Sequence, residues 1–72
     1  MMRYANRTGR SNVSGYEIGD EFIRVKFNRA ARIYTYSHRK AGKHRVDKLK
    51  ILAQVGHGLN SYINRSVKKL YD

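Results

Sequence analysis

The spacing of apolar residues changes along this chain, from alternation in its first half to helical spacing near its end. Ile23, Val25 and Phe27 alternate with charged side chains, which is the pattern of a strand with one buried face. Near the end, apolar residues recur every three or four positions, which predicts a helix with one buried stripe. The two patterns together predict an α+β fold, in which C-terminal helices cover one face of an antiparallel sheet.

Five elements follow from these patterns and from the residues between them. The predicted strands cover residues 11–16, 21–27 and 32–36, and the predicted helices cover residues 46–55 and 59–70. Gly56 and Gly58 end the first helix, because glycine readily adopts the left-handed conformation past a helix C-terminus. We expect a three-stranded sheet in the order β-β-β-α-α. Six residues form the stripe that packs the last helix on this sheet: Leu59, Tyr62, Ile63, Val67, Leu70 and Tyr71.

The first ten residues combine three arginines with small polar residues and show no apolar period. They predict a flexible basic arm over residues 1–10, followed by one domain over residues 11–72. A domain of this size buries only about 60% of the surface that its unfolded chain exposes. The chain also has no cysteine, so no disulfide can stabilise it. Its stability must therefore come from the apolar core alone.

The sequence lacks the sets of residues that catalysis and cofactor binding need. Three histidines are scattered at positions 38, 44 and 57, and only five acidic residues accompany them. We therefore expect no enzyme, no metal site, no cofactor and no small-molecule substrate. The N-terminus has no apolar signal region, and no run approaches the roughly 18 apolar residues of a membrane span. These patterns favour a cytoplasmic protein with no membrane partner.

Net charge is the strongest indication of function. Sixteen Lys and Arg against five Asp and Glu give a formal net charge of +11, above the magnitude of about 2 to 8 that is usual for a small domain. Such an excess predicts contact with a polyanion. We predict a nucleic acid, RNA ahead of DNA, bound through its backbone with low sequence specificity. The alternative is a protein-interaction module, such as a phage-borne adaptor, that docks an acidic protein.

The densest run of cations lies in the connector of residues 38–45, between the predicted sheet and the predicted helices. No acid lies within this run to neutralise it. We therefore expect the connector to contact phosphates, assisted by cations of the second strand and of the last helix. The predicted nucleic-acid-binding residues are Arg39, Lys40, Lys43, Arg45, Arg24, Lys26, Lys68 and Lys69.

Tyr34 and Tyr36 leave two alternatives open. On the outer face of the sheet, beside Arg24 and Lys26, they form an aromatic and basic platform on which bases stack. On the inner face, beside Ile23, they belong to the core. The alternation of a strand permits only one of the two. The shortage of other large core residues favours the inner face.

Three pieces of the chain carry a likeness to a known family. They are Ser11-Asn12-Val13 followed by Gly15-Tyr16, the strand pair of residues 23–27 and 34–36, and Tyr62-Ile63-Asn64-Arg65 followed by Val67 and Tyr71. The set resembles the KTSC family, small domains named from their occurrence at the C-terminus of certain lysyl-tRNA synthetases. The chain departs from that family in lacking Val-Pro after the tyrosine pair. The resemblance implies an α+β domain, and its link to a tRNA-handling enzyme implies an RNA partner.

Overall fold

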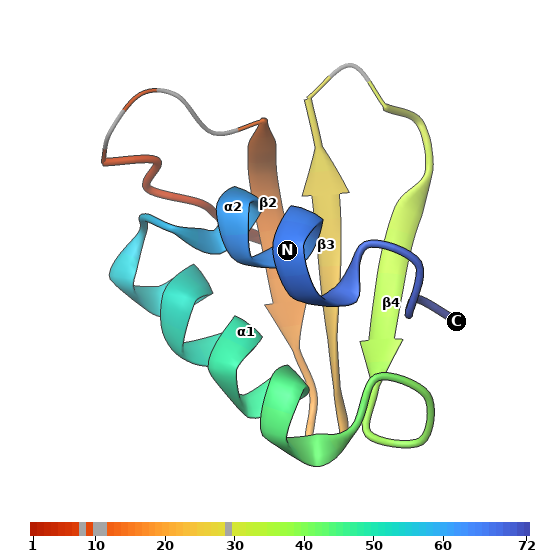
Figure 1. Cartoon of the computed structure of the whole chain (residues 1–72). Coiled ribbons are helices and arrows are strands. Elements are labelled where there is room, and N and C mark those ends of the chain that lie inside the picture. Colours follow the sequence, from red (N-terminus) through yellow and green to blue (C-terminus); the bar gives the residue numbers. More distant parts are fainter. Residues whose placement is uncertain (8, 10–11, 29) are drawn as a thin grey trace.

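The sheet of this protein is an antiparallel meander, and the helices follow it in the chain (Figure 1). The computed structural model describes the whole chain except residues 8, 10, 11 and 29. The strands, in sheet order, are β1 (Met2–Arg3), β2 (Val13–Ile18), β3 (Phe22–Phe27) and β4 (Ile33–Ser37). The helices are α1 (Lys43–Val55), α2 (Leu59–Tyr62) and η1, a π-helical turn (Ile63–Val67) that continues α2. Figure 1 shows the helices together on one face of the sheet, so the predicted α+β class is confirmed.

The prediction of three strands is wrong, because the sheet has a fourth strand, β1. Met2 pairs with Tyr16, and Arg3 pairs with Gly15. Tyr4, which follows β1 directly, is only 3% exposed and belongs to the core. The first residues of the predicted arm therefore pack against the domain. Residues 8 and 10 of that segment lie outside the described residues.

The boundary between α1 and the last helix lies where the glycines predicted it. Gly56 adopts the left-handed conformation, with φ 89°, and its N–H donates to the Leu52 carbonyl at 3.0 Å. The last helix differs from its prediction, because only its first turn is α-helical before η1 begins. The connector is also shorter than predicted, since α1 begins at Lys43 and takes in the end of residues 38–45.

The strand register decides which face the tyrosines of β4 occupy. Tyr36 pairs with Ile23, and Tyr34 pairs with Val25. Ile23 and Val25 are fully buried beneath the helices, so both tyrosines lie on the inner face. Tyr36 is 1% exposed and Tyr34 is half-buried. The alternative of a stacking platform beside cations on the outer face is therefore wrong.

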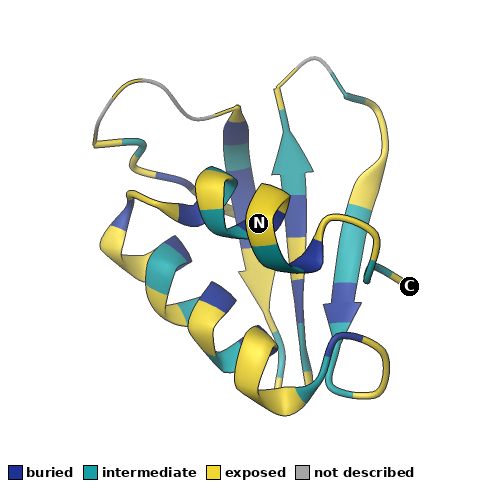
Figure 2. Ribbon diagram, in the orientation of Figure 1, coloured by how far each residue is buried: buried dark blue, intermediate teal, exposed yellow. Residues whose placement is uncertain are grey.

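The core is a single cluster between the sheet and the helices, seen as the dark segments of Figure 2. Leu59, Ile63 and Val67 recur every four residues and are at most 3% exposed, which confirms three members of the predicted stripe. The other three, Tyr62, Leu70 and Tyr71, are half-buried against the core, and the last two lie beyond the end of η1. Burial of each such side chain stabilises the fold by roughly 1.5–3 kcal/mol before entropy is counted. The buried residues are Tyr4, Val13, Tyr16, Ile23, Val25, Tyr36, Ala41, Val46, Leu49, Ala53, Leu59, Ile63 and Val67.

The N-terminal segment forms hydrogen bonds with the end of α1 and with the start of α2. The Arg7 side chain donates from Nε to the Val55 carbonyl at 2.6 Å, and its backbone N–H donates to the Gly56 carbonyl at 2.7 Å. A guanidinium in this position satisfies an unpaired carbonyl and complements the negative end of the helix dipole. The Tyr4 hydroxyl accepts a hydrogen bond from the N–H of Leu59 at 3.4 Å. Residues far apart in the chain are thereby joined at one corner of the fold.

Within the part of the chain that the structure describes, no helix has both the length and the apolar character to cross a membrane.

Candidate nucleic-acid interface

A cluster of aromatic rings lies between the sheet and the C-terminal tail. The rings of Phe27 and Tyr34 meet edge to face with their centroids 5.6 Å apart, and those of Tyr34 and Tyr71 meet likewise at 4.7 Å. The ring of Tyr36 also meets that of Tyr71 edge to face, with the two centroids 6.5 Å apart. Edge-to-face pairs of this kind contribute about 0.5–1.5 kcal/mol beyond the area that they bury. The cluster therefore joins β3, β4 and the tail into one surface.

Two polar contacts hold the tail that carries Tyr71. The backbone N–H of Asp72 donates to the Thr35 carbonyl of β4 at 2.7 Å. The Ser37 hydroxyl donates to the Asp72 carboxylate at 2.8 Å. Because both contacts are made to β4, they fix the tail beside that strand and place the Tyr71 ring against it.

A groove of about 360 Å³ opens beside these rings, and we call it the aromatic groove. The exposed Lys68 and Lys69, which follow η1 directly, line it together with the rings. Among the described residues, no ion pair engages either lysine. The lining residues are Phe27, Ala30, Tyr34, Tyr36, Ile63, Asn64, Lys68, Lys69 and Tyr71.

Arg32 adds a third cation to the rim of the aromatic groove. Its guanidinium carbon lies 5.0 Å from the centroid of the Tyr34 ring and 4.9 Å from that of the Tyr71 ring. Such cation–π contacts contribute about 0.5–1 kcal/mol at an exposed site. Arg32 was not among the binding residues predicted from the sequence. The available signal was its place two residues before Tyr34, on the same face of the strand.

The π-helical turn η1 forms one wall of the aromatic groove through Ile63 and Asn64. Turns of this kind are rare, and they occur frequently at functional sites. The turn keeps Ile63 and Val67 in the core while Asn64 and Lys68 remain exposed. It therefore presents polar side chains to the groove from a well-packed support.

A second hollow, of about 700 Å³, adjoins the aromatic groove, and we call it the asparagine pocket. The two share Phe27 and Asn64 as lining residues. The residues that line the asparagine pocket are Asn12, Phe27, Asn28, Asn60 and Asn64. This site was not predicted from the sequence, although the four-residue spacing of Asn60 and Asn64 was available as a signal.

The structure places four of the predicted binding residues along β4 and the tail. Lys68 and Lys69 line the aromatic groove, as described above. Arg39 and Lys40, in the turn after β4, line a shallow hollow together with Ser37 and Asp72. The tail thus leads from one pair of cations to the other.

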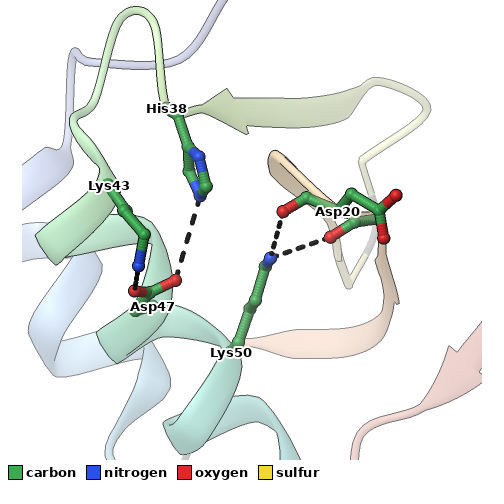
Figure 3. Close-up of polar contacts among 6 residues, drawn as sticks. Asp20, His38, Lys43, Asp47 and Lys50 are labelled. Atoms are coloured by element: carbon green, nitrogen blue, oxygen red, sulfur yellow. Dashed lines mark hydrogen bonds and ion pairs between the residues drawn. The ribbon is translucent and has the colours of Figure 1, made fainter.

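Lys43 lies elsewhere and is already paired with an acid. Its ammonium group lies 2.7 Å from the Asp47 carboxylate, one helical turn further along α1 (Figure 3). This hydrogen bond lowers the pKa of the Asp47 carboxyl from its ordinary value. His38 lies 3.8 Å from the same carboxylate. The expectation that no acid neutralises the connector is therefore wrong for Lys43.

The remaining predicted residues lie away from the aromatic groove. Arg45, in the first turn of α1, donates to the Ala41 carbonyl at 3.3 Å. Arg24 and Lys26 lie on the outer face of the sheet, where Arg24 forms an exposed ion pair with Glu17 at 3.1 Å. Such pairs contribute about 0–1 kcal/mol. The eight predicted residues therefore do not form one surface.

Among the residues that the structure describes, no group of three His, Asp or Glu side chains could hold a metal ion. Comparisons with protein families, with curated proteins and with solved structures found no match to this chain. The resemblance to the KTSC family stays an interpretation of the sequence.

Proposed function

We propose that this protein binds single-stranded nucleic acid, RNA ahead of DNA, along the aromatic groove. The observation that carries the proposal is the meeting of an aromatic cluster with Lys68 and Lys69 in one groove, with the guanidinium of Arg32 over two of the rings. Proteins that bind single strands combine these two features, because bases stack on aromatic rings while phosphates meet positive charges.

Stacking and charge have separate roles in the proposed mechanism. Each base that stacks on a ring, or on the guanidinium plane of Arg32, contributes about 1–3 kcal/mol. A duplex has no unstacked bases to offer, so the mechanism favours single strands. The exposed lysines meet phosphates as flexible point charges. The strand then continues beside the tail toward Arg39 and Lys40, which extends the phosphate contacts to about five.

The positive charge of the groove predicts that the affinity for nucleic acid falls strongly as the salt concentration rises. A single strand that engages about five cations gives a slope of roughly −3.5 in a plot of log affinity against log salt concentration. The net charge of +11 further attracts a polyanion from a distance. A phosphate backbone would also relieve the mutual repulsion of the cations that gather here.

Fluorescence anisotropy with a labelled single-stranded RNA of 12 nucleotides tests the proposal. Lys68→Gln with Lys69→Gln should weaken binding at least five-fold and lower the salt slope by about 1.4. The matched control is Lys26→Gln with Lys48→Gln, which removes the same charge outside the groove and should change affinity less than two-fold. The same measurement with single-stranded DNA and with duplex RNA should give weaker binding.

Equal losses in the two double variants would place the contact elsewhere on the surface. No affinity of the unaltered protein for any nucleic acid at 50 mM salt would reject the proposed function. In that outcome the alternative of an acidic protein partner takes its place, and affinity capture after nuclease treatment is the experiment that identifies the partner.

A further inference from the structure

Four asparagine side chains converge on the asparagine pocket from two different parts of the fold. Asn12 precedes β2 and Asn28 follows β3, and the Asn28 N–H donates to the Asn12 carbonyl, which keeps these two ends of the sheet together. Asn60 and Asn64 are four residues apart on α2 and η1, a spacing that puts both on one side of the helix. The strand ends and the helix therefore present amides toward the same space.

The chemistry of these amides suits a neutral, planar ligand with polar edges. Each carboxamide carries two N–H donors and one carbonyl acceptor, and none of them carries charge. Among the described residues, no side-chain hydrogen bond engages any of the four amides. The ring of Phe27 supplies an apolar surface on the wall that the pocket shares with the aromatic groove. Donors, acceptors and an apolar ring together match the edge and the face of a nucleobase.

We infer that the asparagine pocket binds an unpaired nucleobase by its edge. The inference rests on the proposed function, because the strand that supplies the base is held in the adjoining aromatic groove. It goes beyond that function by giving the protein a preference for one base, where stacking and phosphate contacts alone give none. Adenine is the expected base, since one carboxamide matches its adjacent donor and acceptor in a bidentate pair.

Four labelled RNA oligomers of nine nucleotides provide the test, and we choose A9, U9, C9 and a nine-residue abasic strand. The unaltered protein should bind A9 at least five-fold more tightly than the other three. Asn60→Ala, at a residue that lines the asparagine pocket and not the aromatic groove, should bring A9 within two-fold of U9, while the affinity for the abasic strand stays unchanged. Alanine is the better helix former, so this variant should fold, and circular dichroism checks that it does.

Two further variants separate base reading from other effects. Asn12→Ala, at the far wall of the pocket and outside the aromatic groove, should also reduce the preference for A9. The matched control is Gln54→Ala, which removes an exposed amide from α1 outside the pocket and should leave every affinity unchanged.

The outcomes distinguish this inference from the proposed function. Equal affinity of the unaltered protein for A9, U9 and C9, with weaker binding of the abasic strand, would overturn base reading and leave the proposed function in place. A preference for A9 that survives in both pocket variants would overturn the assignment to this pocket. If the unaltered protein binds none of the oligomers, the proposed function fails, and this inference fails with it.

Discussion

The ring of Tyr71 stands edge-on to the ring of Tyr34, with the ring planes 79° apart and the centroids 4.7 Å apart. Tyr34 belongs to β4, whereas Tyr71 belongs to the tail that follows η1. Arg32 lies over both rings, so the same two side chains that join the tail to the sheet also hold a cation at the rim. The aromatic groove therefore exists only while the tail lies on β4.

Tyr71→Ala should remove one wall of the groove and weaken single-stranded RNA binding at least five-fold, because a stacking surface and a support for Arg32 are lost. Anisotropy titration measures the affinity, and a thermal melt measures the stability of the same variant. The control is Tyr62→Ala, which removes a half-buried tyrosine that packs on the core without lining the groove. An equal loss of affinity in both variants would show that lowered stability is the cause.

Removing Arg39 and Lys40 tests how far the bound strand extends. Arg39→Gln with Lys40→Gln should lower the salt slope by about 1.4, the value for two phosphate contacts of a single strand. Lys43→Gln should leave the slope unchanged, because Asp47 already neutralises Lys43. A slope that responds to Lys43 and not to the other pair would restore the start of α1 as the binding surface.

Tyr4→Ala should lower the free energy of unfolding by about 3–5 kcal/mol, the usual cost of truncating a buried aromatic side chain. For a domain whose total stability is about 5–15 kcal/mol, that is a large share. Urea unfolding followed by circular dichroism measures the change. Met2→Ala is the control, since Met2 is 63% exposed and its loss should cost less than about 0.5 kcal/mol. A small effect of both variants would mean that the N-terminal segment does not support the core.

Gly56→Ala should destabilise the protein for two reasons. Its φ of 89° is left-handed, which costs a residue with a side chain about 1–2 kcal/mol. An added Cβ would also lie 2.7 Å from the Cβ of Ala5. Gly58→Ala is the matched control, because its φ is 83° but the nearest atom, on Leu52, is 3.6 Å away. Urea unfolding should show a larger loss at position 56; equal losses would argue against the close packing of the N-terminal segment.

Alkaline pH should destabilise the fold through Tyr36. Burial, with Tyr34 and Tyr71 nearby, raises the pKa of Tyr36 from 10.0 to about 12. Between these values the unfolded chain releases the proton while the folded protein keeps it, so stability falls as pH rises. This contribution is complete below about pH 10 and is lost by about pH 12. Tyr36→Phe should flatten the decline in unfolding free energy over that range; an identical decline in both proteins would contradict the shift.

Sequence patterns predicted the core face of the fold better than its edge. The alternation in β3 and the spacing in the last helix identified the buried residues, because each element is long enough to show its period. β1 has two residues and cannot show a period at all. Tyr4 is an isolated aromatic residue in a segment with no apolar period, and only its contacts with the domain reveal it as core. Local sequence patterns therefore could not predict the fourth strand.

The candidate site was predictable in its charge and not in its geometry. Lys68 and Lys69 were identified as cations, but the rings of Phe27, Tyr34 and Tyr36 beside them come from more than thirty positions away in the chain. Only the register of β4 and the path of the tail bring these parts together. The pairing of Lys43 with Asp47 follows from i,i+4 spacing once α1 is known to begin at Lys43. The first residue of a helix is hard to predict from sequence. Because the predicted helix began at residue 46, Lys43 was not recognised as lying one helical turn before Asp47.

The contact between Asp72 and Thr35 has a consequence for self-association. An edge strand with unpaired backbone groups is a template on which another chain can add a strand and begin to aggregate. The Thr35 carbonyl of the edge strand β4 already accepts a hydrogen bond from the tail, so an incoming strand would first have to displace it. The opposite edge, β1, is only two residues long and offers little length for pairing. The tail on β4 and the shortness of β1 thus protect the two edges of the sheet.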